Sequence, residues 1–139
     1  MVKKRFYEWI KVKKSLHESS IQKCVKEGEV WWCGMGENVG VEINGKNEEF
    51  SRPILVFKKF GKYEFMGIPL STKYHKGSWY VTYNFQGKKR TAVLCQAKTI
   101  SVKRLYKRIG QLDEKDMLAI GNGFYKLLFE KNLPQLYSN

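Results

Sequence analysis

Four polar side chains near the ends of predicted strands are of types that can act together on a phosphate group: Glu42, Arg52, Ser71 and Thr72. An arginine stays charged, and its planar fork can bind two phosphate oxygens at once. A hydroxyl can hold a phosphate by hydrogen bonding, and a carboxylate can orient a neighbouring group or accept a proton. Spacing alone also allows each residue an ordinary interpretation, as a surface cation, a turn at a strand end or a solvated loop carboxylate.

Several other classes of site are disfavoured by the sequence. There is no GxxxxGK[ST] loop, and Gly34-Met35-Gly36 is too short for a dinucleotide fingerprint. The two histidines, His17 and His75, lie far apart in sequence, so we do not expect an acid/base pair. The carboxylates do not cluster, and the three cysteines lack the spacing of zinc ligands. We therefore expect a site without a metal or cofactor.

The charge of the chain is its strongest compositional signal. It has 26 Lys and Arg against 13 Asp and Glu, a formal net charge of +13. Such a field attracts polyanions, and nucleic acid is the first candidate because each neutralised phosphate releases counterions. An acidic protein is the second candidate and an anionic membrane surface the third. Because the basic residues are interleaved with aromatic ones along the whole chain, they favour a folded binding face over a basic tail.

Length and composition favour one domain inside the cell. The chain has 139 residues, of which 42% are hydrophobic, enough for one packed core. No apolar run reaches the roughly 18 residues of a membrane span, and no signal-peptide pattern follows the basic start. Three cysteines cannot all pair within one chain, which suits a reducing compartment. We expect a cytoplasmic protein.

The first segment, Lys3 to about Leu16, is predicted to be a helix, because Phe6, Trp9, Ile10 and Lys13 recur at helical spacing and Leu16 continues the apolar stripe. Serines then break the helix, and a short turn is predicted from Ile21 to Val25. This extension is either a strut packed on the domain or a basic arm that reaches a partner. We favour the strut because the apolar stripe needs to be covered.

Short strands with turns between them are predicted from Gly28 onward. They are Val30–Cys33, Pro53–Phe60, Tyr63–Leu70, Trp79–Phe85, and Arg90–Leu94 continuing toward Ile100. The glycine-rich stretch from Gly34 to Lys46 is predicted to be a loop too polar for the core. A five- or six-stranded sheet between two helices, forming a small barrel or sandwich, is the expected architecture.

The end of the chain is predicted to be a helix. Asp113 can cap it, and Pro134 would stop it. Gly121 and Gly123 each cost this helix about 1 kcal/mol relative to Ala. Such a cost suggests close packing against another element or a second copy of the chain. The expected apolar stripe is Met117, Ile120, Phe124, Leu127 and Leu128.

Segments in a particular order also resemble a known family. They are Gly28-Glu29-Val30-Trp31-Trp32, Asn38-Val39-Gly40-Val41-Glu42, Arg52-Pro53-Ile54-Leu55-Val56, Ile68-Pro69-Leu70-Ser71-Thr72, Val93-Leu94-Cys95-Gln96, and a tail from Lys98 to Leu112. Together they resemble the MazF/PemK family of toxin ribonucleases. The similarity runs from Gly28 to about Leu128, so residues 1–27 form a helical extension and residues 28–139 the family-like domain.

The resemblance implies an α+β fold: an SH3-like small β-barrel with a C-terminal helix, here with an extra N-terminal helix, working as a homodimer. It also implies a toxin that cleaves single-stranded RNA at short motifs without a metal, through attack by the 2′-hydroxyl. A cognate antitoxin, with an acidic segment in the groove, would restrain it. By position, Arg52 matches the catalytic arginine and Ser71, with Thr72 beside it, the catalytic threonine. Glu42 matches a loop glutamate near the RNA and Gln96 a polar residue beside the groove.

The sequence departs from the family pattern at two positions. Ser71 replaces a threonine, which keeps the hydroxyl but loses the methyl that restricts its rotamer. Cys95 stands where many relatives carry an acid, so an arginine/hydroxyl scheme is favoured over a carboxylate acid/base scheme.

Further RNA contacts are predicted on the loop rims, from Lys73, Lys76, Lys88, Lys89 and Arg90. One of Tyr74, Trp79 and Tyr80 is expected to stack on a base. Two alternatives stay open. One is a catalytically silent barrel that binds RNA or a peptide, and the other is an interaction protein whose basic groove serves only an acidic partner.

Overall fold

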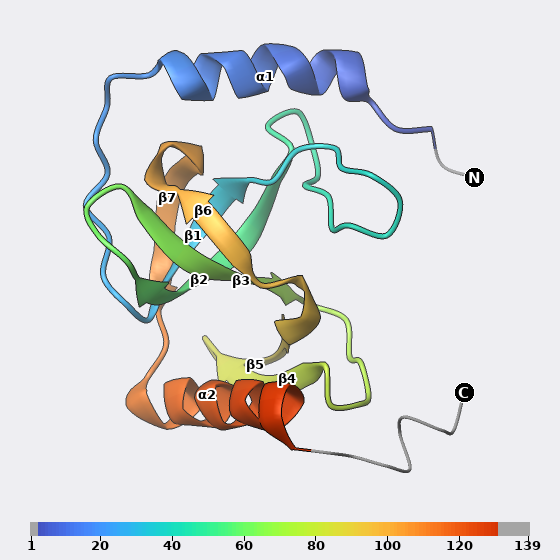
Figure 1. Cartoon of the computed structure of the whole chain (residues 1–139), viewed down its shortest axis with the longest axis vertical. Helices are drawn as coiled ribbons and strands as arrows, with labels where there is room; N and C mark the ends of the chain where they lie inside the picture. Colours follow the sequence, from blue (N-terminus) through green and yellow to red (C-terminus); the bar gives the residue numbers. More distant parts are fainter. Residues whose placement is uncertain (1–2, 131–139) are drawn as a thin grey trace.

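The computed structural model describes residues 3–130, and within them seven strands lie between two helices (Figure 1). The α+β fold is thereby confirmed. The elements are α1 (Phe6–Glu18), β1 (Glu29–Gly34), β2 (Ser51–Lys59), β3 (Glu64–Ser71), β4 (Tyr80–Phe85), β5 (Lys88–Val93), the 3-10 turn η1 (Leu94–Gln96), β6 (Lys98–Ser101), the 3-10 turn η2 (Val102–Arg104), β7 (Leu105–Gln111) and α2 (Glu114–Phe129).

All strand pairs are antiparallel, in the order β4-β5-β3-β2-β1-β7, with β6 paired to β3. The path has β4 at one end and β7 at the other, so the pairing does not show a closed barrel. Strand β3 has three neighbours. It pairs with β6 from Glu64 to Gly67 and with β2 up to Pro69, whereas its last residues, Leu70 and Ser71, pair with β5. The sheet therefore divides where β3 ends.

The expected five or six strands were too few. Strand β7 was missed because its pairing with β1 is irregular, with register shifts between Val30 and Trp31 and between Trp32 and Cys33. Such bulges interrupt the alternation of buried and exposed residues on which strand prediction depends. The single strand expected from Arg90 toward Ile100 was also wrong, since η1 divides it into β5 and β6.

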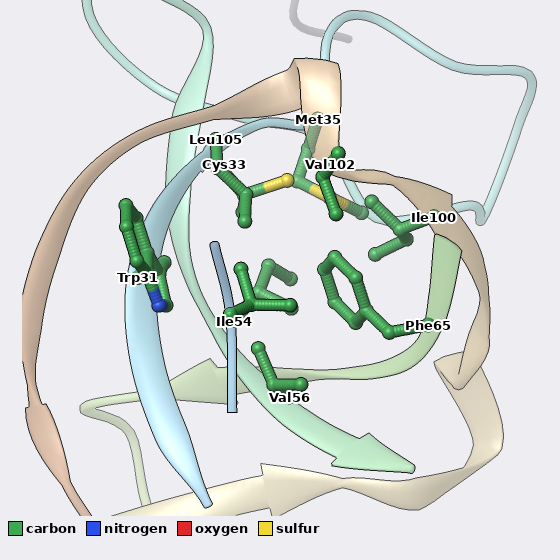
Figure 2. Close-up of a cluster of buried hydrophobic side chains, with 10 residues drawn as sticks. Trp31, Cys33, Met35, Ile54, Val56, Phe65, Ile100, Val102 and Leu105 are labelled. Carbon is green, nitrogen blue, oxygen red and sulfur yellow. The ribbon is translucent and has the colours of Figure 1, made fainter. Parts of the chain in front are cut away.

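Alternate residues of β2 serve two separate cores. Ile54 and Val56 join a cluster with Phe65 and Ile100 inside the curved sheet (Figure 2). Leu55 joins a second cluster under α2, because successive side chains of a strand point to opposite faces. The first core also includes Met35, 1% exposed, from the glycine-rich loop. The expectation that this loop is too polar for the core was therefore wrong at its first residues.

Helix α1 lies at the opposite end of the sheet from α2 (Figure 1). Trp9 is its one buried residue, whereas Phe6 and Ile10, which were expected to share its stripe, are exposed. The strut interpretation is confirmed because Trp9 packs on the domain. The turn expected from Ile21 to Val25 is absent, and these residues have no regular structure.

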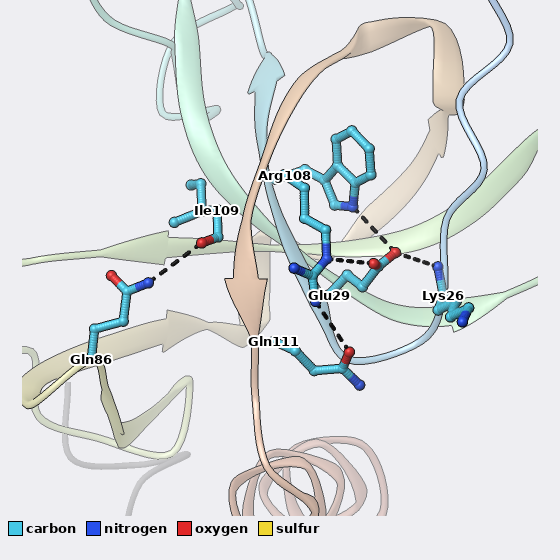
Figure 3. A network of polar contacts seen from close by, with 7 residues as sticks. Lys26, Glu29, Gln86, Arg108, Ile109 and Gln111 are labelled. Atoms are coloured by element: carbon cyan, nitrogen blue, oxygen red, sulfur yellow. Dashed lines mark hydrogen bonds and ion pairs between the residues drawn. The ribbon is translucent and has the colours of Figure 1, made fainter.

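A polar network around Glu29 joins the start of β1 to β7 (Figure 3). Its carboxylate accepts hydrogen bonds from Arg108 Nε at 2.6 Å, Lys26 N at 2.6 Å and Trp31 Nε1 at 3.4 Å. Burial by itself raises the pKa of Glu29, but these hydrogen bonds and the Arg108 charge outweigh it, so the pKa is lower than usual. The network stabilises the fold when Glu29 is ionised.

Helix α2 begins at the predicted cap, since the Asp113 side chain accepts from Asp116 N at 2.9 Å. Ile120 is buried, but Leu128 is 57% exposed and does not belong to the packed stripe as expected. A Cβ at Gly123 would lie 2.4 Å from Val81 Cγ2, whereas one at Gly121 would meet its nearest neighbour at 3.8 Å. Gly123 therefore permits close packing on β4. Pro134 lies outside the described residues.

Gly121→Ala and Gly123→Ala are expected to change stability in opposite directions. At position 121 the methyl has room, so the better helix propensity should stabilise the fold by up to about 1 kcal/mol. At position 123 the methyl overlaps a β-branched side chain, and overpacking should destabilise it by about 1–3 kcal/mol. Urea unfolding measures both. If both substitutions change the free energy of unfolding in the same direction, the packing of α2 on β4 is contradicted.

Glu29→Gln is expected to lower the free energy of unfolding by about 1–3 kcal/mol at pH 7. The folded pKa of Glu29 lies below its unfolded value, so its stabilisation is complete above the unfolded pKa, about 4.3. It is lost as the pH falls through the folded pKa. The difference in free energy of unfolding between wild type and variant should therefore become smaller below about pH 4. Urea unfolding across pH tests this, with Glu18→Gln, an exposed i,i+4 partner of Lys14, as the matched control.

Candidate functional site

A cavity of about 640 Å³ opens where β3 leaves β2 to pair with β5. Its walls are the β1–β2 loop (residues 35–50), the start of β2, the end of β3 and the β4–β5 hairpin. Trp32, Pro53, Phe85 and Ile109 supply apolar surface. The cavity thus combines an apolar floor with polar strand ends.

Antiparallel pairing explains why Arg52 and Ser71 share this cavity. Ile54 pairs with Pro69 and Leu55 with Ile68, so continuing the register by two residues brings Arg52 level with Ser71. Both residues line the cavity, as does Thr72. The three residues selected as a possible phosphate site are therefore brought together, although they lie on two different strands and the segment after β3.

The guanidinium of Arg52 is held from one side only. Its Nε donates to Asn44 O at 2.9 Å, and among residues 3–130 its two terminal amines have no hydrogen-bond partner. Burial lowers the pKa of Arg52, although arginine stays charged in proteins. The side chain is therefore oriented, with both terminal amines left to donate to an anion in the cavity.

The hydroxyl of Ser71 is oriented by the backbone that follows it. Ser71 Oγ accepts from Lys73 N at 3.1 Å, and this bond leaves the O–H free to donate. Thr72, next in sequence, is exposed. Each hydroxyl can hold an oxyanion by hydrogen bonding.

Glu42 and Gln96 both act on the β1–β2 loop. Glu42 does not line the cavity, and its Oε1 accepts from Val39 N at 2.9 Å within the loop. Gln96 lines the cavity, but its Oε1 accepts from Ile43 N at 3.2 Å and its Nε2 donates to Val41 O at 3.2 Å. The amide of Gln96 thus ties the loop to η1.

The cavity is electropositive. Four of the described residues that line it are cationic and none is a carboxylate; the cations are Lys46, Arg52, Lys73 and Arg90. Lys76, Lys88 and Lys89 are exposed and lie outside the lining. Clustered charge of one sign in a concave site concentrates counterions of the other sign. An anionic ligand fits this cavity.

Sequence reasoning missed His75, which lines the cavity and stacks on Tyr80 with ring centroids 4.7 Å apart and planes 15° apart. The sequence disfavours a pair with His17, which lies on α1, and the segment around His75 carries no signal of its own. Tyr80 is also the one lining residue of the three aromatics considered for stacking; Tyr74 and Trp79 are exposed outside the lining. Lys46 and Trp32 were missed too, and nothing in the local sequence distinguishes them.

The cysteines lie in three different environments. Cys33 is buried in the first core, and burial raises its pKa to about 12. Cys95 lines the cavity, and Cys24 is exposed. In the described part of the chain, no group of three or more His, Cys, Asp or Glu side chains could hold a metal ion.

A family model of PemK-like, MazF-like toxins of type II toxin–antitoxin systems matches residues 26–128, and the chain belongs to that family. No curated protein sequence matches the chain. Among the described residues, no helix is long and apolar enough to cross a membrane.

Two solved structures resemble the fold. One is an endoribonuclease in complex with its cognate antitoxin from a mycobacterial species, with a TM-score of 0.59, 13% identity, and coverage of 78% of this chain and 98% of that chain. The other is the Mycobacterium tuberculosis toxin MazF-mt6, with a TM-score of 0.51, 17% identity, and coverage of 63% of this chain and 93% of that chain. At these identities the likeness concerns the fold.

Proposed function

We propose that this toxin is an endoribonuclease that cleaves single-stranded RNA at short motifs, without a metal ion, through attack by the 2′-hydroxyl. The main support is the position of the free Arg52 amines, in one cationic cavity with the Ser71 and Thr72 hydroxyls. Family membership supports the same activity.

The proposed roles of these side chains follow from the negative charge that develops on the phosphate during RNA cleavage. The 2′-oxygen attacks phosphorus, the bond to the 5′-oxygen breaks, and the products carry a 2′,3′-cyclic phosphate and a 5′-hydroxyl. Negative charge grows on the non-bridging oxygens, where the planar fork of Arg52 can donate two hydrogen bonds. The hydroxyls of Ser71 and Thr72 hold the same phosphate and keep the attacking and leaving oxygens in line.

Proton transfer is assigned to His75 rather than to Glu42. The Glu42 carboxylate is engaged with Val39 N in the loop, outside the cavity lining. The imidazole of His75 lines the cavity and is oriented by Tyr80. It accepts the proton of the 2′-hydroxyl, and the imidazolium then returns a proton to the departing 5′-oxygen.

The same cavity accounts for the proposed partners. Its positive charge suits the RNA backbone, and Tyr80 and Trp32 offer aromatic surface for bases. An acidic segment of a cognate antitoxin would compete for the same cations and so block RNA. We also propose that the protein works as a homodimer in the cytoplasm, in line with its family.

Arg52→Ala is expected to reduce RNA cleavage by at least about 10²-fold, because the main charge stabiliser is lost. The assay is incubation of the purified protein with a long RNA in EDTA, followed by mapping of fragment ends. Arg52→Lys keeps the charge but not the fork, and should stay impaired. Lys59→Ala, an exposed cation at the other end of β2 and outside the lining, is the matched control. A fully active Arg52→Ala protein would falsify the assignment.

The same assay separates the alternatives. Discrete fragments with 2′,3′-cyclic phosphate ends support the ribonuclease. Tight RNA binding that weakens as salt rises, with no product, would instead indicate a catalytically silent binding module. Little affinity for RNA at moderate salt, together with binding of an acidic peptide, would indicate a groove that serves only a protein partner.

His75→Gln is expected to lower kcat by about 10²–10⁴-fold, because the side chain proposed to move the proton is lost. His17→Gln, the other histidine of the chain, is the matched control because it lies on α1. A His75→Gln protein with the wild-type kcat would rule out this role.

A further inference from the structure

Helix α1 precedes the family match, which begins at residue 26, yet its contacts reach the wall of the cavity. The β1–β2 loop, residues 35–50, runs beneath α1 (Figure 1). This loop has little regular structure, and several of its residues, including Val41 and Ile43, line the cavity. A long irregular segment of this kind loses much conformational entropy when it is held in one conformation.

Trp9 fits a notch in the loop that only glycine can form. A Cβ at Gly36 would lie 2.2 Å from Trp9 Cε2, and Gly36 itself has a φ of +81°. On its other side, the Trp9 ring lies 5.5 Å from the ring of Phe50, centroid to centroid. The Arg104 guanidinium stacks over Trp9 at 5.7 Å. Trp9 thus contacts both ends of the loop.

Phe50 is the strained residue at the loop's second end. Its φ of 52° lies in the left-handed region, which bulky side chains rarely adopt. Besides the contact with Trp9, its ring is covered by the Arg5 guanidinium at 4.2 Å from the ring centroid. Side chains that precede or belong to α1 therefore enclose the residue whose backbone needs most support.

Hydrogen bonds from the residues before α1 also reach the middle of the loop. Arg5 donates to Asn47 O at 2.8 Å, and Lys4 Nζ donates to Gly40 O at 3.1 Å and to Asn38 O. Asn47 itself lines the cavity. The contacts of Lys4 and Arg5 thus end on the segment that forms the cavity wall.

The loop in turn orients the proposed charge stabiliser. Asn44 O, between the segments held by Lys4 and Arg5, accepts from Arg52 Nε at 2.9 Å. From the opposite side, Gln96 ties Val41 and Ile43 to η1. The loop is therefore held between α1 and η1, and Arg52 takes its orientation from the loop.

We propose that α1 and the two residues before it are a positioning element of the site. They hold the β1–β2 loop in the shape that forms one cavity wall and orients Arg52. This inference rests on the proposed ribonuclease function for its catalytic consequence, but its structural part stands apart from that function. Trp9 and Arg5 are positioning residues, since they act through the loop and do not line the cavity.

The test combines amide hydrogen exchange with RNA cleavage in EDTA. Trp9→Ala and Arg5→Ala should speed exchange of loop residues 35–50 by tenfold or more, while amides of β2 and β3 stay protected. Cleavage should fall by a similar factor, with the larger part in kcat because Arg52 loses its orientation. Trp9→Phe should retain much of the loop's protection from exchange and much of the cleavage activity. Ile10→Ala, on the exposed side of the same helix, is the matched control.

Arg5→Ala covers the case in which Trp9→Ala unfolds the domain, because Arg5 is only partly buried. The proposal is overturned if loop exchange in both variants equals that of Ile10→Ala, or if the loop loosens and cleavage is unchanged. A wild-type protein that cleaves no RNA would refute the proposed function instead, and the exchange measurement would still decide whether α1 holds the loop.

Discussion

The structure depends on the point at which β3 changes partners. Up to Pro69 this strand pairs with β2, and from Leu70 it pairs with β5. Beyond that point β2 and β3 no longer pair with each other, and the side chains of Arg52 and Ser71 at these strand ends line the cavity. The β4–β5 hairpin, held by Gly123 of α2 close to Val81, forms the far wall. The polar strand ends of the cavity are therefore a consequence of the sheet topology, and the β1–β2 loop adds one wall to them.

The charges around this opening are not balanced within it. Two arginines outside the cavity show the contrast, because Arg108 is paired with Glu29 and Arg104 donates to Gly34 O. Among the described residues, Arg52 bonds one carbonyl and no residue that lines the cavity carries a carboxylate. Such an arrangement costs free energy when the cavity is empty and regains it when an anion enters. Under the proposed function, this one feature would serve both an RNA phosphate and an acidic antitoxin segment, and the two would compete because they need the same donors.

Local patterns predicted most of the fold, and the failures have physical reasons. The two strands of the β2–β3 hairpin and the Asp113 cap follow from short-range chemistry. Strand β7 was missed because bulges against β1 disturb its pattern, and Met35 because its burial depends on distant partners. For the site, Arg52 and Ser71 could be brought together by hairpin register alone. His75 could not, because a residue in an irregular segment has no periodicity from which its direction follows.

The wall of the cavity shows how a family site can depend on residues that the family pattern does not include. The matched region, residues 26–128, contains Arg52, Ser71, Thr72 and the whole β1–β2 loop. It does not contain Trp9, whose ring occupies the notch at Gly36, nor Arg5, which covers Phe50 and bonds Asn47. A larger side chain at position 36 would displace the tryptophan, and a smaller one at position 9 would leave the notch empty, so the two positions constrain each other. The loop conformation that orients Arg52 is thus encoded jointly by the loop and by a helix some thirty residues earlier in the chain.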